Sequence, residues 1–149
     1  MNQQIIPADL WQRCENIYHT HQGLCLQLQD EYGVNVNVLL LACILDQIPC
    51  HLPQQQWQKI IAVATNWDRE LIMPFRNLRR RAKSRLTPFE YQKMLKLELQ
   101  FERKVQQQLL PELQKLSQVI IERSNLNILI DEYQLDSKLL ENLIELNTN

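Results

Sequence analysis

The chain of 149 residues contains only 2 glycines, Gly23 and Gly33. Average usage would supply roughly ten glycines in a chain of this length. Tight β-hairpin turns need residues at positive φ, which glycine adopts most readily, so this scarcity argues against an all-β fold. It also excludes a glycine-rich loop that cradles phosphate. Leucine (26 residues) and glutamine (19 residues) are abundant, and both are good helix formers. The sequence therefore predicts an all-α protein.

The length and the absence of internal repeats or a long linker indicate one domain over residues 1–149. We expect a single compact bundle of about six to eight helices, with residues 1–6 and 147–149 frayed. The segment Val38–Leu45 is the longest apolar run. A helix that is apolar all round must be buried, so this segment is predicted to form the central helix.

Capping residues mark the predicted helix boundaries in the first third of the chain. Asp9 and Asn35 precede apolar segments and predict helix starts. Gly33 follows a helix expected over residues 22–32, at the position where a glycine commonly ends a helix. A break at 49–53 then separates the apolar segment from a fourth helix.

Three later features set the expected boundaries in the rest of the chain. Pro74 lies within a helical pattern over residues 67–86 and should kink it or divide it in two. Thr87–Glu90 reads Thr-Pro-Phe-Glu, a capping box that should begin a long helix. We expect that helix to reach about Leu110, Pro111 to interrupt it, and a further helix to follow to about residue 123.

A short last helix is predicted after Asp136, which can serve as its N-cap. It would present Leu139, Leu140, Leu143 and Ile144 to the core.

The N-terminal segment Met1–Leu10 has neither a basic region nor an apolar region, so we expect no signal peptide. No apolar run reaches the roughly 20 residues that a membrane span needs, so we expect no membrane association. No pair of cysteines has the C-x-x-C spacing, and we expect free, buried thiols in a reducing cytoplasm. The cysteines are Cys14, Cys25, Cys43 and Cys50.

The long predicted helix carries two carboxylates on its apolar face. At ~100° per residue, Glu98 and Glu102 fall within the stripe that buries the apolar side chains of this helix. A buried carboxylate without a partner costs several kcal/mol, so each needs one. The preceding helix should pack antiparallel, and Arg79 on its apolar side would reach Glu98 or Glu102.

Two interpretations of these groups remain open. An Arg–Glu network would only fix the register of the two helices. Alternatively, the groups would line a polar pocket with acid/base or ligand-binding roles, and Asp30 and Asn37 near Gly33 would join it unless they serve only as helix caps. The candidate ligand-binding residues are therefore Asp30, Asn37, Arg79, Glu98 and Glu102.

The sequence provides no catalytic motif and no metal-binding pattern. Di-metal helical bundles use Glu-x-x-His pairs, and the long helix contains no histidine. His19 and His21 have no cysteine or aspartate nearby in a zinc-binding pattern, and no serine lies in a nucleophile elbow. We therefore expect no catalytic residues, no metal and no cofactor.

The net charge of −1 conceals a basic middle between acidic ends. Residues 1–58 carry one basic and five acidic side chains, residues 59–104 carry twelve and five, and residues 105–149 carry three and seven. Within the middle, four basic residues fall on the face opposite Trp67 and are predicted to form an exposed basic ridge. Such a ridge suits an acidic protein partner, and suits nucleic acid less because exposed aromatic residues are not interleaved with it. The ridge consists of Arg69, Arg76, Arg80 and Lys83.

Several segments together resemble the signature of a bacterial family of small helical proteins, a domain of unknown function of about this length. The first is a Leu-Gln-Asp sequence followed by Gly33 and a Val-Asn-x-Leu-Leu sequence. The second is a Trp…Pro…Arg…Lys stretch, and the third is a Glu-Leu…Glu…Gln stretch. In this chain they are Leu28-Gln29-Asp30, Val36–Leu40, Trp67, Pro74–Arg76, Leu78-Arg79, Arg81, Lys83, Glu98-Leu99, Glu102 and Gln106.

This resemblance spans about residues 10–110 and implies a small, soluble, bacterial, cytoplasmic protein. It implies no activity, although it places Arg79, Glu98 and Glu102 among the motif residues. The chain departs from the pattern at Cys43, where tryptophan is common, and at Phe75 and Ala82, where leucine is.

Three functions are therefore expected, in order. The first is a non-enzymatic helical module that binds an acidic protein through the basic ridge. The second is an enzyme or a binder of a small anionic ligand that uses the polar pocket. The third is weak binding of nucleic acid through the same ridge.

Overall fold

A computed structural model describes residues 6–48, 50–113, 123–141 and 143. The described part contains seven α-helices and no strand, which confirms the all-α prediction. Except for Ile6, the termini expected to fray lie outside the described residues. The elements are α1 (Leu10–Thr20), α2 (Gln22–Tyr32), α3 (Val36–Gln47), α4 (Gln54–Trp67), a π-helical turn η1 (Asp68–Ile72), α5 (Met73–Ala82), a 3₁₀ turn η2 (Lys83–Arg85), α6 (Pro88–Leu113), α7 (Asn125–Glu132) and a 3₁₀ turn η3 (Ser137–Leu140).

Helix α3 is enclosed by other helices. All eight residues of Val38–Leu45 are at most 3% exposed. Helices α1, α2, α4 and α7 all contact α3. Four neighbouring helices therefore bury the apolar run on all sides.

The turn into α3 follows the predicted caps. Gly33 adopts the left-handed conformation with φ 67°, and the next N–H, of Val34, donates to the carbonyl of Leu28 (3.1 Å). Asn35 then begins α3, and its side-chain Oδ1 accepts a hydrogen bond from the N–H of Val38 (3.1 Å). Both expectations from the sequence are confirmed.

The C-terminal part of α3 is joined to α7 by a buried polar cluster. Asp46 accepts hydrogen bonds from the backbone N–H groups of Asn125 (2.7 Å) and Leu126 (3.1 Å) at the start of α7. Asn125 is fully buried, and its side-chain oxygen accepts from the N–H of Leu52 and the indole of Trp57, both at 2.9 Å. The sequence analysis assigned no helix to α7. Asn125 is a poor helix former, so burial and these bonds define the element.

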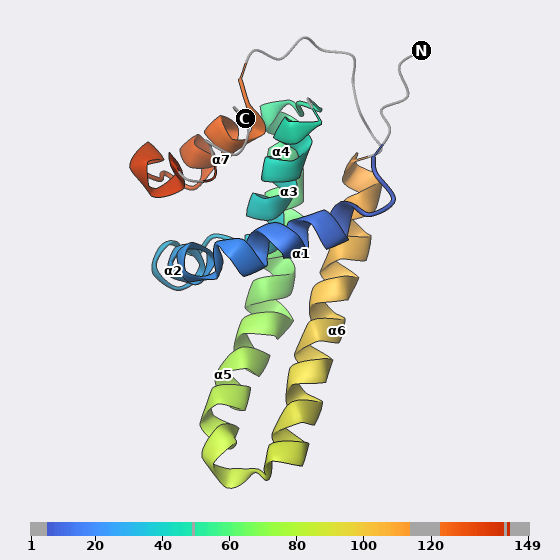
Figure 1. Ribbon diagram of the computed structural model, residues 1–149, viewed down its shortest axis with the longest axis vertical. Coiled ribbons are helices and arrows are strands. Elements are labelled where there is room, and N and C mark those ends of the chain that lie inside the picture. The colour runs from blue at the N-terminus through green and yellow to red at the C-terminus, as the bar shows by residue number, and fades with distance from the viewer. Residues whose placement is uncertain (1–5, 49, 114–122, 142, 144–149) are drawn as a thin grey trace.

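Pro74 neither kinks one helix sharply nor separates two. Helix α4, the π turn and α5 are continuous (Figure 1), and Pro74 lies in the first turn of α5. In a regular α-helix its ring would clash with the carbonyl of Glu70, to which it also has no N–H to donate. In the wider turn, the N–H of Met73 donates instead to the carbonyl of Asp68, five residues back.

The π turn rotates α5 relative to the face predicted by uninterrupted helical periodicity. One extra residue in a turn moves all later side chains by ~100° around the axis. Leu78, which uninterrupted helical spacing from Trp67 would place on the apolar face, is therefore 48% exposed. Arg76, predicted to lie on the exposed ridge, turns inward, and its side chain is only 12% exposed.

Helices α5 and α6 form a long antiparallel hairpin whose closed end projects beyond the other helices (Figure 1). The predicted capping box begins α6. The N–H of Thr87 donates to Glu90 (2.9 Å), and the N–H of Glu90 donates to the Thr87 hydroxyl (3.2 Å). Farther along the hairpin, the Phe75 and Phe101 rings pack edge to face at 5.3 Å between centroids.

The predicted interruption at Pro111 is wrong. Helix α6 continues to Leu113, which is fully buried together with Leu109. Pro111 removes one hydrogen bond near the end of the helix, and the burial of the leucines on either side outweighs that loss. The further helix expected after it, to about residue 123, falls largely on residues outside those described.

Two other expected caps differ in outcome. Asp9 lies at the start of α1 without a capping hydrogen bond and instead forms an ion pair with Arg13 (3.1 Å). Asp136 accepts from the N–H of Lys138 (3.0 Å) and begins the predicted last helix, which opens as the 3₁₀ turn η3.

All four cysteines are free and buried, as expected. Among the described residues, no helix combines the length and apolar character needed to cross a membrane.

The two glycines make a matched pair for a stability test. Gly33→Ala should lower the free energy of unfolding by about 1 kcal/mol, because the left-handed φ of 67° is strained for a residue with a Cβ, even though no other residue stands close to that Cβ. Gly23→Ala, within α2 and without a close neighbour, should change it by about 0.5 kcal/mol or less. Urea unfolding followed by circular dichroism measures both. Equal effects of the two substitutions would show that the left-handed conformation of Gly33 does not contribute to stability.

Candidate functional site

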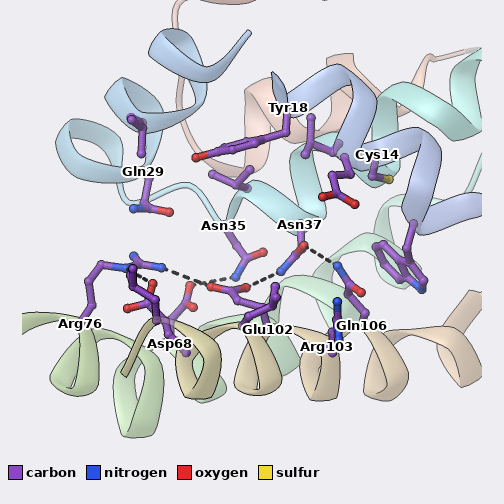
Figure 2. A pocket seen from close by; sticks show the side chains of 18 of the residues that line it. Cys14, Tyr18, Gln29, Asn35, Asn37, Asp68, Arg76, Glu102, Arg103 and Gln106 are labelled. Carbon is purple, nitrogen blue, oxygen red and sulfur yellow. Dashed lines mark hydrogen bonds and ion pairs between the residues drawn. The ribbon is translucent and has the colours of Figure 1, made fainter. Parts of the chain in front are cut away.

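A pocket of about 600 Å³ separates α1 and α2 from the α5–α6 hairpin, with the first turn of α3 at its back (Figure 2). That volume is within the range of small-molecule sites, roughly 300–1,000 Å³. Polar side chains from η1, α3, α5 and α6 make one wall, which we call the floor. Side chains from α1 and α2 face the floor from the other side.

The π turn and the start of α3 supply one part of the floor. Asn35, already fixed by capping α3, donates from Nδ2 to Asp68 Oδ2 (2.9 Å). Asp68 therefore lies near the N-terminal end of α3, where the helix dipole favours negative charge. Burial raises the pKa of Asp68 above its ordinary value, while the Asn35 hydrogen bond and the Arg76 charge act to lower it.

A second row of hydrogen bonds crosses the floor between α3 and α6 (Figure 2). Asn37 donates to Glu102 Oε2 (2.7 Å), and Gln106 donates to Asn37 Oδ1 (3.2 Å). Burial raises the pKa of Glu102, and the nearby Asp68 and Glu98 carboxylates add to that rise. Arg76 and Asn37 act in the opposite direction.

Two arginines of α5 complete the floor. Arg76 contacts Glu102 Oε1 (3.2 Å) and lies 3.8 Å from Glu98 Oε2. Arg79 donates to Glu98 Oε1 (2.8 Å) and to the hydroxyl of Tyr91 (2.7 Å). The guanidinium groups are thus committed to carboxylates at low exposure, which stabilises the antiparallel packing of α5 on α6.

The structure brings together most of the predicted ligand-binding set. Asn37, Arg79, Glu98 and Glu102 all line the pocket. Asp30 does not. Its carboxylate is 53% exposed and lies 3.9 Å from Arg80.

The predicted basic ridge is divided. Arg76 faces the pocket, because the π turn rotates α5. Arg69, Arg80 and Lys83 remain exposed, with Arg69 beside Glu70 (3.3 Å) and Lys83 over the ring of Tyr91.

Asp68 and Arg76 are pocket residues that the sequence analysis missed. The available signal was Pro74, which demands a local change of helix geometry and so undermines a face assigned by uniform periodicity. Gln29 and Gln106 belong to the resemblance motif, but nothing in their local sequence distinguished them from surface glutamines.

The α1–α2 wall carries polar groups that lack partners. The indole N–H of Trp11 is buried and donates to no acceptor among the described residues. Within the same part of the chain, neither the Tyr18 hydroxyl nor the Gln29 amide forms a hydrogen bond. Tyr18 and Gln29 face the floor across the pocket (Figure 2). Only the Trp11 N–H is buried, whereas the polar atoms of Tyr18 and Gln29 are not. A ligand can therefore replace the water at Tyr18 and Gln29.

Cys14 also lines the pocket. Burial raises the pKa of its thiol to about 12, so it is protonated at neutral pH and a poor nucleophile. Among the described residues, no three His, Cys, Asp or Glu side chains are placed to share a metal ion.

Fold and site together define a small all-α protein with a mixed-charge pocket between two helical layers. The chain belongs to the family described as "Protein of unknown function (DUF2390)", which matches residues 9–109. This match confirms the resemblance to a domain of unknown function, and it spans every residue that lines the pocket. No curated protein and no solved structure matches the chain.

Stability measurements can test whether Arg76 is buried against Glu98 and Glu102 while Arg80 is exposed. Arg76→Met should lower the free energy of unfolding by about 2 kcal/mol, because Glu102 and Glu98 lose a partly buried cation. Arg80→Met, four residues along the same helix, should change it by less than about 0.5 kcal/mol, because its ion pair is exposed. Urea unfolding of both variants measures the difference. Similar losses of stability in the two variants would show that Arg76 is exposed like Arg80.

Proposed function

We propose that this protein binds a small polar molecule in the pocket between α1–α2 and the α5–α6 hairpin. The observation that carries the proposal is the contrast between the two walls. The polar groups of the floor are hydrogen-bonded or ion-paired to one another, whereas Tyr18 and Gln29 on the facing wall form no side-chain hydrogen bond among the described residues. A ligand between the walls would form hydrogen bonds with these two side chains.

The construction of the floor supports a binding role. A network fixed by helix caps and Arg–Glu pairs holds its groups in place before a ligand arrives, which reduces the entropy lost on binding. A π turn places Asp68 on the floor beside Asn35, and such turns are frequent at functional sites. The proposal is for binding rather than for covalent catalysis, because the one thiol in the pocket is held protonated.

The setting we infer is the cytoplasm of a bacterium. The four free, buried thiols support a reducing compartment. The bacterial source rests on the family resemblance in the sequence.

Partly filling the pocket should weaken ligand binding without unfolding the protein. Leu99 lines the pocket and is 48% exposed, so Leu99→Trp adds bulk at its edge with little strain on the core. Leu97, on the same helix and 40% exposed, does not line the pocket, so Leu97→Trp is the matched control. We expect fragments that shift the Trp11 indole resonance of the full chain to lose about tenfold in affinity with Leu99→Trp only.

The measurement is a screen of small polar fragments by ¹H–¹⁵N correlation spectra, with circular dichroism to show that both variants fold. Fragments that bind only elsewhere on the surface, or that bind Leu99→Trp as well as the natural chain, would contradict the proposed function.

We infer a second candidate function from the closed end of the hairpin, as a surface for an acidic protein. Phe89 is 71% exposed, with the ammonium group of Lys93 4.6 Å from the centre of its ring, and the residues before it in the chain include further exposed basic side chains. This cluster replaces the predicted ridge, which loses Arg76 to the pocket. Its basic members are Arg80, Arg81, Lys83, Arg85 and Lys93.

Charge reversal can test whether this surface, rather than the net charge of the protein, binds an acidic partner. Lys83→Glu/Arg85→Glu should weaken binding of a fluorescein-labelled polyglutamate peptide by about tenfold at low salt, measured by anisotropy. Lys59→Glu/Lys104→Glu changes the net charge equally at exposed sites away from the hairpin end and should have a smaller effect. Equal losses of affinity in the two double variants would show that binding depends only on net charge. Tighter binding of single-stranded DNA than of the peptide would favour nucleic acid instead.

A further inference from the structure

We propose that the ligand of this pocket carries a positively charged amine, which sits between Asp68 on the floor and the oxygen atoms of Gln29 and Tyr18 on the facing wall. This inference rests on the proposed pocket function and names the chemical class of its ligand.

The first argument is the distribution of charge on the floor. Arg76 and Arg79 lie against Glu98 and Glu102, and the side chains of these two arginines and of Glu98 are at most 16% exposed, so solvent screens these charges less than it does at the surface. Arg80 and Arg103 also line the pocket, but both are exposed and neither forms an ion pair with Asp68 among the described residues. A cation is therefore missing locally, at Asp68.

The second argument is the position of Asp68. Both arginines direct their nitrogens at Glu98 and Glu102, and among the described residues no cation lies within ion-pair distance of Asp68. Its only hydrogen bond there comes from Asn35, to Oδ2. The carboxylate that lacks an ion pair is therefore the one held in place by the capping residue of α3 (Figure 2).

The third argument comes from the facing wall. An ammonium group offers three donors and needs three acceptors. Tyr18 and Gln29 have oxygen atoms with no donor among the described residues, and both side chains face the floor near Asn35 (Figure 2). With Asp68 they supply acceptors from two walls, and Trp11 adds an aromatic ring to the lining of the same pocket.

An anionic ligand, which the sequence led us to expect, fits this arrangement less well. Near Asp68, its carboxylate or phosphate would meet a like charge, and it would have to displace Glu98 or Glu102 from Arg76 and Arg79. The other two arginines of the pocket, Arg80 and Arg103, are exposed. A metal ion is also disfavoured, because Arg76 occupies the position between Glu98 and Glu102 that the ion would need.

The charge state of the floor gives the inference a pH dependence. Burial raises the pKa of Asp68 and of Glu102, so both carboxylates take up protons above the pH at which exposed carboxylates do. Protonation removes the charge that attracts an amine, so affinity should fall as pH is lowered from neutral toward and below those raised values. Other charged or titratable groups facing this region are Arg76, Arg79, Glu98 and Tyr133, with Glu15, His19, Arg80 and Arg103 also lining the pocket.

The test compares three probes of matched shape with the full-length ¹⁵N-labelled chain. The probes are phenethylamine, 2-phenylethanol and phenylacetate, which differ in charge at one end. At neutral pH we expect phenethylamine to shift the Trp11 indole and Asn35 side-chain resonances and to bind about tenfold more tightly than 2-phenylethanol. Phenylacetate should bind more weakly still. Addition of magnesium chloride alone should leave these resonances in place.

Asp68→Asn keeps the shape of the side chain and an oxygen to accept from Asn35, but removes the charge. It should reduce the affinity for phenethylamine about tenfold and flatten its pH dependence. Asp131→Asn, which removes an exposed carboxylate paired with Arg123, should change neither. Because Asp68→Asn relieves a desolvation cost, we expect it to fold at least as well as the natural chain.

Equal or tighter binding of 2-phenylethanol or phenylacetate at the same resonances would overturn the amine inference and leave the pocket function standing. An unchanged affinity in Asp68→Asn would overturn it too. If none of the three probes moves the Trp11 resonance, the inference fails, and the fragment screen with Leu99→Trp decides the pocket function separately.

Discussion

The burial of α3 is the constraint on which the rest of the structure depends. Eight consecutive apolar residues in one helix leave no face for solvent, so neighbours must cover every side. The polar atoms at and near the two ends of that helix still need partners, because unmet hydrogen bonds in the interior are costly. At the N-terminal end, Asn35 and Asn37 bind Asp68 and Glu102. Toward the C-terminal end, Asp46 binds the first N–H groups of α7. One end of a structural helix thereby becomes the back of the pocket.

The π turn links the local demands of Pro74 to the chemistry of the floor. A proline inside a helix removes one hydrogen bond and crowds the preceding turn, and the chain relieves both by widening that turn. The resulting rotation brings Arg76 inward to face Glu98 and Glu102. It also puts Leu78 on the surface. The pocket and the exposed face of the hairpin are therefore consequences of one distortion in the backbone.

The floor illustrates how the same contacts serve packing and binding. Two arginines neutralise two carboxylates and fix α5 against α6, as one interpretation of the sequence expected. The third carboxylate, Asp68, forms no ion pair among the described residues and is stabilised by a neutral amide, the end of a helix dipole and the more distant charge of Arg76. A purely structural network would gain nothing from that imbalance, since burying an unpaired charge costs free energy. For this reason the two interpretations, a register-fixing network and a ligand pocket, are compatible in this molecule.

The sequence by itself determined the helical class, the caps at Gly33, Asn35 and Thr87, and the presence of Glu98 and Glu102 opposite Arg79. These features depend on short-range rules of backbone conformation and on helical spacing, which act within a few residues. Only the tertiary structure decided the direction of Arg76, the inclusion of Asp68 and the exclusion of Asp30. Helical phase beyond a proline depends on how the backbone relaxes, and partners 33 or 65 residues apart, such as Asn35 with Asp68 and Asn37 with Glu102, meet only after the helices pack.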